Sequence, residues 1–333
     1  MPPSAVPKVA SSPANVDKAA RFVPSVVSGT STTPNRRDTG LFVRRALYQN
    51  FSSSPAKISS VTAFSPMAPV LFQIMSDLHL ETHPSYNYKF KQTAPYLALL
   101  GDIGMVGDDQ LFHFLETQVK RYWAVFFLLG NHEPSKLGFE AAKTRMRAFE
   151  SRIMDLRARS TIGRFVFLDQ TRYDISNTLT ILGCTLFSAI APRQETAVAS
   201  RLVDFRDIPQ WTIQAHNAAH RSDLDWLNQQ VLHIAEEEPH RQIAVFTHHS
   251  PCVDDRAIDP KHRDSEVLSG FVADLSSELC WACPAVKVWA FGHTHYNTFF
   301  TNEVGAKIIA NQKGYYALPE LSFRPEHVYS VGE

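Results

Sequence analysis

The chain of 333 residues contains only four cysteines, and their arrangement argues against a site built from thiolates. Cys280 and Cys283 have the spacing of a redox motif, but no thioredoxin-like pattern surrounds them and no second pair completes a zinc site. Cys184 and Cys252 are isolated. A small number of cysteines that act as packing residues is typical of proteins in a reducing compartment. We therefore expect the protein to be located in the cytoplasm.

Other features are missing as well, and each absence excludes a class of protein. No apolar run reaches the length of a membrane span, so we expect a soluble protein with no membrane partner. The chain has no internal repeat and no glycine-rich phosphate loop. After the first 66 residues no stripe of lysine and arginine occurs, which disfavours a nucleic-acid partner. No partner protein is indicated.

Charge divides the chain into two unlike parts. Residues 1–66 carry eight Lys or Arg against two Asp, a net charge of about +6, and the remainder carries about −6. Because serine, proline and threonine crowd the first part, we expect residues 1–66 to be disordered and residues 67–333 to form one domain. The basic, Ser-rich stretch around Arg44 and Arg45 resembles an organelle transit segment, so a mitochondrial location is an alternative. Translation that begins at Met67 is another explanation.

Five short polar clusters each follow directly on an apolar run that is typical of a buried strand. In an open α/β sheet ligands bind outside the carboxyl ends of the strands, so distant residues can converge on one crevice. The runs are Leu71–Met75, Tyr96–Leu100, Val125–Leu129, Ile243–Phe246 and Val286–Phe291. The clusters are Asp77-Leu78-His79, Gly101-Asp102, Gly130-Asn131-His132-Glu133, His248-His249 and Gly292-His293-Thr294-His295. Strands alternate with helical stretches, which predicts an α/β layered domain with helices over Asp109–Arg121 and Phe139–Arg159.

The clusters supply carboxylate, amide and imidazole groups, a set that suits divalent ions such as Mn, Fe, Zn or Mg. Seven candidate ligands exceed the four to six that one ion uses, so we expect two divalent metal ions. If Asp102 bridges them, each ion receives four protein ligands. Two ions about 3.5–4 Å apart lower the pKa of a bridging water and stabilise in-line displacement at phosphorus, which predicts phosphoester hydrolysis by a metal-bridging hydroxide. The candidate ligands are Asp77, His79, Asp102, Asn131, His248, His293 and His295.

These motifs, in this order, resemble those of the calcineurin-like metallophosphoesterase superfamily over roughly Leu71 to Asn311. The resemblance implies a four-layer α/β/β/α sandwich with two central mixed sheets. It implies that His132 is catalytic and donates a hydrogen bond to the phosphoryl group or a proton to the leaving oxygen. It implies one metal held by Asp77, His79, Asp102 and His295, and another held by Asp102, Asn131, His248 and His293.

The second motif departs from that of the protein Ser/Thr phosphatases in this superfamily. Those enzymes carry Gly-Asp-x-Val-Asp-Arg-Gly, whereas Gly101 to Gly107 read Gly-Asp-Ile-Gly-Met-Val-Gly. The Asp that would orient the catalytic His and the Arg that would grip phosphate are both missing. The segments Asp204–Ile208, His216–His220 and Asn311–Tyr315 are similar to a largely uncharacterised microbial and fungal branch. We therefore expect a small phosphomonoester or phosphodiester as substrate rather than a phosphoprotein.

Three residues are candidates for substrate binding, namely Arg206, His216 and His249. His216 and His220 share one face of a helix predicted over Thr212–Glu238, so they either reach the active-site mouth or are solvated. Arg206 lies just upstream, in a segment that could cover the site as a lid. His249 follows the candidate ligand His248 at the end of a strand. It lies either on the side of the substrate or behind the metal ligands.

Several assignments leave alternatives open. Asp77 and Asp102 could instead cap following helices. His248 and His249 could exchange roles, and Glu133 could be catalytic or could serve the first turn of the next helix. At the level of function, the rivals are a metal-dependent nuclease and a non-catalytic scaffold that kept the fold.

Overall fold

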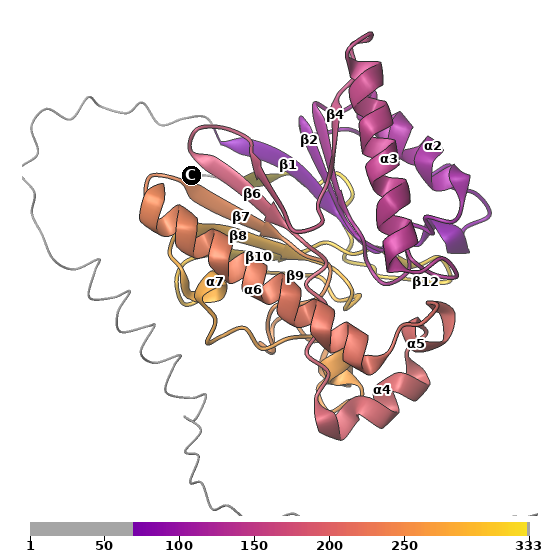
Figure 1. The fold of residues 1–333 in the computed structure, drawn as a ribbon, viewed down its shortest axis with the longest axis vertical. Coiled ribbons are helices and arrows are strands. Elements are labelled where there is room, and N and C mark those ends of the chain that lie inside the picture. Colours follow the sequence, from indigo (N-terminus) through magenta and orange to yellow (C-terminus); the bar gives the residue numbers. More distant parts are fainter. Residues whose placement is uncertain (1–68, 332–333) are drawn as a thin grey trace, which may run out of the picture.

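The structure is a computed structural model that describes residues 69–331. The expected disordered segment 1–66 and the alternative start at Met67 lie outside the described residues. Two large mixed sheets and the helices around them make up the described part of the chain (Figure 1). None of the helices in this part combines the length and the apolar composition that a bilayer crossing requires.

The first sheet has five strands in the order β13-β1-β2-β3-β4. Its edge strand β13 (Tyr329–Val331) pairs antiparallel with β1. The other strands run parallel, and they are β1 (Val70–Met75), β2 (Tyr96–Leu100), β3 (Ala124–Leu128) and β4 (Arg164–Phe167). All five positions of β3 are buried, as a parallel strand covered on both faces requires. The carboxyl ends of β1, β2 and β3 therefore lie along one edge.

The second sheet has six strands in the order β5-β6-β7-β8-β10-β9. Antiparallel strands form both of its edges, β5 (Thr171–Asp174) and β9 (Thr298–Thr301). The central strands run parallel, and they are β6 (Leu179–Gly183), β7 (Gln242–Phe246), β8 (Val286–Phe291) and β10 (Lys307–Ala310). A separate short hairpin follows, made of β11 (Gly314–Tyr315) and β12 (Leu318–Pro319).

Helices cover the outer face of each sheet (Figure 1). The first sheet carries α2 (Asp109–Val119) and α3 (Phe139–Arg157), and the second carries α6 (Ile213–Glu237) and α7 (Leu279–Ala282). The α2 helix begins after Asp108 rather than Asp102, because the Asp108 side chain accepts from the backbone N–H of Gln110. Short helices lie near the start of α6, namely α4 (Glu195–Arg201) and α5 (Asp204–Asp207). The 3-10 helices are η1 (Leu80–Thr82), η2 (Pro192–Gln194), η3 (Pro260–His262) and η4 (Leu268–Gly270).

Three apolar clusters hold the layers together. The cluster between the two sheets joins side chains of the first sheet to those of the second, including Phe72, Phe126, Ile181 and Phe246. A second cluster packs α2 and α3 on the first sheet, including Leu111, Phe149 and Phe127. A third packs α6 and α7 on the second sheet, including Leu227, Cys280 and Trp289. These clusters confirm the four-layer α/β/β/α sandwich expected from the sequence.

The observed elements follow the predicted ones closely, with ends that shift by one or two residues. The helix predicted over Thr212–Glu238 is α6, and Thr212 caps it by accepting from the backbone N–H of Ala215. The edge strands β5 and β13 were not predicted. All four cysteines are free and buried, which fits their expected role in packing.

Candidate metal centre

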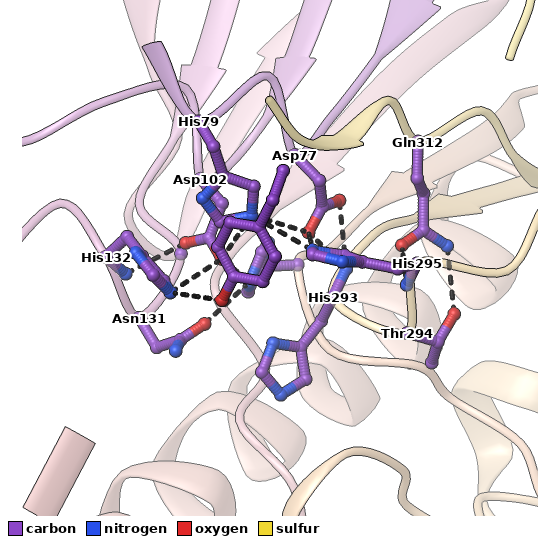
Figure 2. A network of polar contacts seen from close by, with 12 residues as sticks. Asp77, His79, Asp102, Asn131, His132, His293, Thr294, His295 and Gln312 are labelled. Carbon is purple, nitrogen blue, oxygen red and sulfur yellow. Dashed lines mark hydrogen bonds and ion pairs between the residues drawn. The ribbon is translucent and has the colours of Figure 1, made fainter. Parts of the chain in front are cut away.

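The polar clusters predicted from the sequence meet at one place, between strand ends of both sheets (Figure 2). The first sheet contributes the residues that follow β1, β2 and β3, and the second contributes those that follow β7 and β8. Because parallel strands end at the same edge, side chains that are distant in sequence become neighbours. Six of the seven candidate ligands are buried and His295 is half-buried. The seven are Asp77, His79, Asp102, Asn131, His248, His293 and His295.

One group of donor atoms comes from Asp77, His79 and His295. The Nε2 atoms of the two imidazoles lie 3.0 Å apart. The Oδ1 atom of Asp77 lies 3.2 Å from Nε2 of His295 and 4.0 Å from Nε2 of His79. Because His79 Nδ1 donates to Oε1 of Glu81 over 3.0 Å, Nε2 is the nitrogen of His79 that is free for a metal.

A second group comes from Asp102, His248 and His293, with Asn131 beside it. The Nε2 atom of His248 lies 3.5 Å from Oδ2 of Asp102 and 3.1 Å from Oδ1 of Asn131. His248 Nδ1 donates to the backbone carbonyl of Leu100 over 2.8 Å, which turns Nε2 toward the group. An outer hydrogen bond of this kind is how a metal-binding histidine is usually oriented.

The carboxylate of Asp102 lies between the two groups, since Oδ2 is 3.8 Å from Nε2 of His79 and 3.5 Å from Nε2 of His248. Burial raises the pKa of Asp102, but the neighbouring imidazoles, led by His248, hold it well below its ordinary value. Within the described residues, the ion-pair partners of Asp77 and Asp102 are all histidines. Buried carboxylates need balancing cations, so this donor set fits two divalent ions.

The backbone at the centre is strained. Residues other than glycine seldom adopt a positive φ, because the Cβ atom crowds the backbone. Among the described residues ten do so, and five of these are candidate ligands. Such strain concentrates at functional sites. The five are Asp77 (54°), His79 (46°), Asp102 (53°), His293 (70°) and His295 (47°).

At two glycines of the sequence motifs, a ligand carboxylate occupies the space that a side chain would need. A Cβ atom at Gly130 would lie 2.2 Å from Oδ1 of Asp102, and one at Gly292 would lie 2.6 Å from Oδ2 of Asp77. Both distances are shorter than any real contact of a Cβ atom. Glycine at these positions therefore permits the strand ends to approach the ligands.

Glu133 fastens the loops after β2 and β3 to each other. Its Oε2 accepts from the backbone N–H groups of Asp102 and Gly130, and its Oε1 accepts from that of Ile103, over 2.7–2.9 Å. Burial and the charge of Asp102 raise the pKa of this carboxyl to about 8, while the N–H donors lower it. Both alternatives weighed for Glu133 are thus corrected. The side chain neither serves the next helix nor lines the cavity beside the centre.

Replacing Glu133 with alanine is expected to lower the free energy of unfolding by roughly 3 kcal/mol or more. A buried donor left without a partner costs about 1–3 kcal/mol, and three buried N–H groups would lose their acceptor. Urea unfolding of the metal-free protein measures the change without a contribution from bound ions. Glu236→Ala, on the exposed face of α6, is the control and should shift stability by about 0.5 kcal/mol or less. Equal stability of the two variants would contradict the role of Glu133.

His132 follows β3 and lies between Glu81 and Tyr315. Its Nδ1 donates to Oε1 of Glu81 over 3.1 Å, and the hydroxyl of Tyr315 lies 3.2 Å from Nε2. Nε2 also lies 4.0 Å from Oδ2 of Asp102, so it faces the candidate centre, and His132 forms a third group of possible metal ligands with His79 and Asp102. Burial lowers the pKa of His132, but the charges of Asp102 and Glu81 outweigh this effect and raise it to about 10.

Glu81 orients two imidazoles at once, and the sequence analysis missed it. Its Oε1 accepts from Nδ1 of both His79 and His132. Burial raises the pKa of Glu81, but the hydrogen bonds from these two rings lower it to about 2, so the carboxyl group is ionised. Glu81 thus supplies the carboxylate that is missing from the second motif after Asp102. The signal that could have revealed it is the alternation of Asp77, His79 and Glu81.

Replacing Glu81 with glutamine is expected to lower kcat/KM by about 10–100-fold, the usual effect of removing an outer partner of a metal-site histidine. Glutamine keeps the size of the side chain and loses the charge that holds both rings. Initial rates in excess metal measure the effect, with Glu236→Gln as the exposed control. Full activity of Glu81→Gln once metal is in excess would show that Glu81 acts through metal affinity alone and does not orient His132.

Two further side chains hold the ligand segments from outside. Nδ2 of Asn131 donates to Oδ1 of Asp204 over 2.8 Å, which leaves Oδ1 of Asn131 directed at His248. Oε1 of Gln312 accepts from the backbone N–H of His295 over 2.6 Å (Figure 2). Asp204 and Gln312 belong to segments singled out in the sequence. Their observed role is to support the ligands.

A cavity of about 380 Å³ opens beside the centre, and Asn131, His132 and Tyr315 are part of its lining. The predicted lid segment reaches this cavity in part, because residues 201–204 line it. The structure corrects the prediction for Arg206. Its guanidinium pairs with Asp207 over 2.8 Å, its side chain is 72% exposed, and it does not line the cavity.

The predictions for His216 and His249 are corrected in the same way. His216 is fully buried, and its Nε2 accepts from the backbone N–H of Ser188 over 3.2 Å. His220 shares that helix face, as predicted, but the face packs beneath the segment after β6 instead of reaching the cavity or solvent. His249 is fully buried behind the ligands, with its ring 4.2 Å from that of His293. Neither His216 nor His249 lines the cavity.

The chain belongs to the calcineurin-like phosphoesterase family, whose profile matches residues 72–297, and it is a metal-dependent phosphoesterase. An uncharacterised protein of Acanthamoeba polyphaga mimivirus is 25% identical over 269 residues, which cover 74% of this chain and 91% of that protein. A solved phosphopantetheinyl hydrolase from Mycobacterium tuberculosis has a TM-score of 0.57 and 12% identity, covering 79% of this chain and 96% of that one. A dimetal phosphatase from Danio rerio has a TM-score of 0.45 and 16% identity, covering 77% and 91%.

Proposed function

We propose that this protein hydrolyses a small phosphomonoester or phosphodiester with the help of two divalent ions. The observation that carries the proposal is the position of the Asp102 carboxylate between the two groups of donor atoms. In this place Asp102 would be a ligand of both ions. Two ions that share a bridging ligand are suited to displacement at phosphorus.

The residues divide into two sets of four that share Asp102. The first set would be Asp77, His79, Asp102 and His295, and the second would be Asp102, Asn131, His248 and His293. When bound, the two ions supply an activated water as nucleophile and withdraw charge from the phosphoryl oxygens. Carboxylate, amide and imidazole donors accept Mn, Fe, Zn or Mg, and we propose that one of these fills the centre.

The chain itself supplies the proton for the leaving group. Glu81 fixes the ring of His132 through Nδ1, so Nε2 is held toward the cavity. The hydroxyl of Tyr315 contacts Nε2 from the other side and limits rotation of the ring. In this position Nε2 can donate a proton to the oxygen that departs from phosphorus, a step that general acids typically accelerate by 10²–10⁴-fold.

The proposal is tested with a panel of chromogenic phosphomonoesters and phosphodiesters in the presence of Mn, Mg, Zn or Fe. We expect hydrolysis of at least one ester, loss of activity with a chelator, and recovery when metal is returned. Activity that persists without metal, or no hydrolysis with any ester and metal, would overturn the proposal. The panel also separates a monoesterase from a diesterase, because each class of ester releases the same chromophore.

A further inference from the structure

The cavity beside the centre has two unlike sides. On one side lie the ligand and acid groups, which include Asp102, Asn131 and His132. The apolar side comprises the aliphatic and aromatic side chains of the lining, and six of these are Leu202, Val203, Ile258, Val267, Leu268 and Phe271. A volume of about 380 Å³ is within the range of sites for small molecules, roughly 300–1,000 Å³.

The apolar side is joined directly to the centre. The ring of Phe271 stacks on that of His293 with centroids 4.8 Å apart and planes inclined by 24°. The backbone carbonyl of Gly270 accepts from Nε2 of the same histidine over 3.3 Å. A phosphoryl group placed at the ligands would therefore have this side of the cavity next to one of its ester oxygens.

The apolar side is built in advance by contacts between two chain segments. Gln194 accepts from the backbone N–H of Ser269 over 2.8 Å and donates to the carbonyl of Ser265 over 3.1 Å. Arg201 pairs with Glu266 over 2.6 Å. These contacts fix the region of α4 against η4. The cavity needs no folding of a loop around its ligand, and a preformed site loses less entropy on binding.

The charges around the cavity argue against a polyanionic leaving group. Arg201 is the one Lys or Arg among the described residues that line the cavity, and its guanidinium is already paired with Glu266. Asp204 adds a buried carboxyl group, and the carboxylate of Asp259 is paired with Lys261 over 2.6 Å. Further phosphates of a nucleoside diphosphate or a nucleic-acid strand would thus meet apolar side chains and no unpaired Lys or Arg among the described lining residues.

We infer that the substrate is a phosphoester of a small apolar alcohol, whose hydrocarbon part lies against Val203, Leu268 and Phe271. This rests on the proposed function. In the reaction, the oxygen of water forms a bond to phosphorus as the P–O bond to the alcohol breaks. The electron pair of that bond stays on the alcohol oxygen, which takes a proton from His132, and the proton lost by water restores His132. The products of a monoester are the apolar alcohol and inorganic phosphate.

The test compares n-hexyl phosphate with glycerol phosphate, two aliphatic monoesters that differ chiefly in the polarity of the alcohol. We expect kcat/KM for the hexyl ester to be at least about tenfold higher, since even one methylene group in an apolar pocket changes specificity by about 10–200-fold. Phosphate release by the full-length, metal-loaded protein measures both rates. Equal rates, or a preference for the glycerol ester, would overturn the inference and leave the proposed function intact. Hydrolysis of neither these esters nor the chromogenic panel would instead overturn the proposed function.

Variants locate the effect in the cavity. Leu268→Asn keeps the size of the side chain and should reduce the hexyl-to-glycerol preference by about tenfold or more, while Leu232→Asn on α6 should leave it unchanged. Val203→Phe narrows the same side and should slow the hexyl ester more than methyl phosphate. It provides the comparison if Leu268→Asn does not fold. Unchanged preference in the folded variants would contradict the inference.

A lipid is the other source of an apolar phosphoester, and its chain length separates it from a small alcohol. Hexadecyl phosphate in phosphatidylcholine vesicles should be a poorer substrate than the soluble hexyl ester, because a cavity of about 380 Å³ does not enclose sixteen carbons. A higher rate on the vesicles would overturn the assignment to a small alcohol.

Discussion

Replacing His132 with asparagine should lower kcat by roughly 10²–10⁴-fold while the bound metal stays nearly unchanged. The imidazole contacts Glu81 and Tyr315 and lies 4.0 Å from Oδ2 of Asp102. It also lies close enough to His79 and Asp102 to share an ion with them, so the metal content of the variant decides between a proton donor, as we propose, and a metal ligand. Steady-state phosphate release from an ester of an aliphatic alcohol, paired with metal analysis after dialysis, measures both quantities.

The matched control is His113→Asn, which changes an exposed histidine on α2 and should leave kcat within about twofold. The dependence of the effect on the leaving group gives a second check. Acidic phenols depart from phosphorus without taking up a proton. The activity of His132→Asn on their esters should therefore fall less than its activity on esters of aliphatic alcohols. If His132→Asn lost metal along with activity, the residue would be a ligand or a structural group, and its role as a proton donor would be wrong.

Replacing Asp102 with alanine should abolish activity and reduce the metal content from about two ions per chain to less than one. Its Oδ2 lies near both groups of donor atoms, and its Oδ1 accepts from the backbone N–H of His132 over 2.8 Å. Removing the carboxylate therefore takes a shared ligand from both ions, and the rate should fall to background. Metal analysis of the dialysed variant, alongside the same ester assay, tests this.

The Asp102 experiment needs a control for backbone strain, because this residue has a φ of 53°. Asn tolerates that conformation better than Ala, so Asp102→Asn separates the loss of charge from the change in backbone. Asp109→Ala, at an exposed aspartate of α2, controls for a general change of charge. A variant at Asp102 that kept two tightly bound ions would contradict the shared-ligand arrangement and, with it, the proposed chemistry.

The gathering of seven distant side chains was predictable because each follows a strand that is easy to recognise. The run before Asp102 is Tyr96–Leu100, and the strand has those bounds. A short, wholly apolar segment followed by glycine leaves little freedom for the strand to end elsewhere. Once the strands are parallel neighbours, the positions after their ends are fixed in space.

The supporting residues were harder to predict, since their partners depend on how the loops fold in three dimensions. Glu133 accepts from backbone N–H groups 30 and 31 positions earlier in the chain, and nothing in the local sequence reports this. His216 and His220 were placed on one helix face correctly, but a helical period does not tell whether a polar face meets solvent or another loop. The side chain of Arg206 pairs with Asp207, its neighbour in sequence, and does not line the cavity.

The candidate ligands belong to strands of both sheets, and this has a consequence for the unfolded chain. His79 and His295 are 216 positions apart, yet a single ion would touch both. In polymer terms, the ion closes a very long loop, which the unfolded chain closes only at a large entropic cost. An ion that binds the native state alone stabilises it by about 2.7 kcal/mol at a concentration one hundred times its Kd. The thermal midpoint of this protein should therefore rise steadily with metal concentration, and bound ions would act as a reversible cross-link between the two halves of the sandwich.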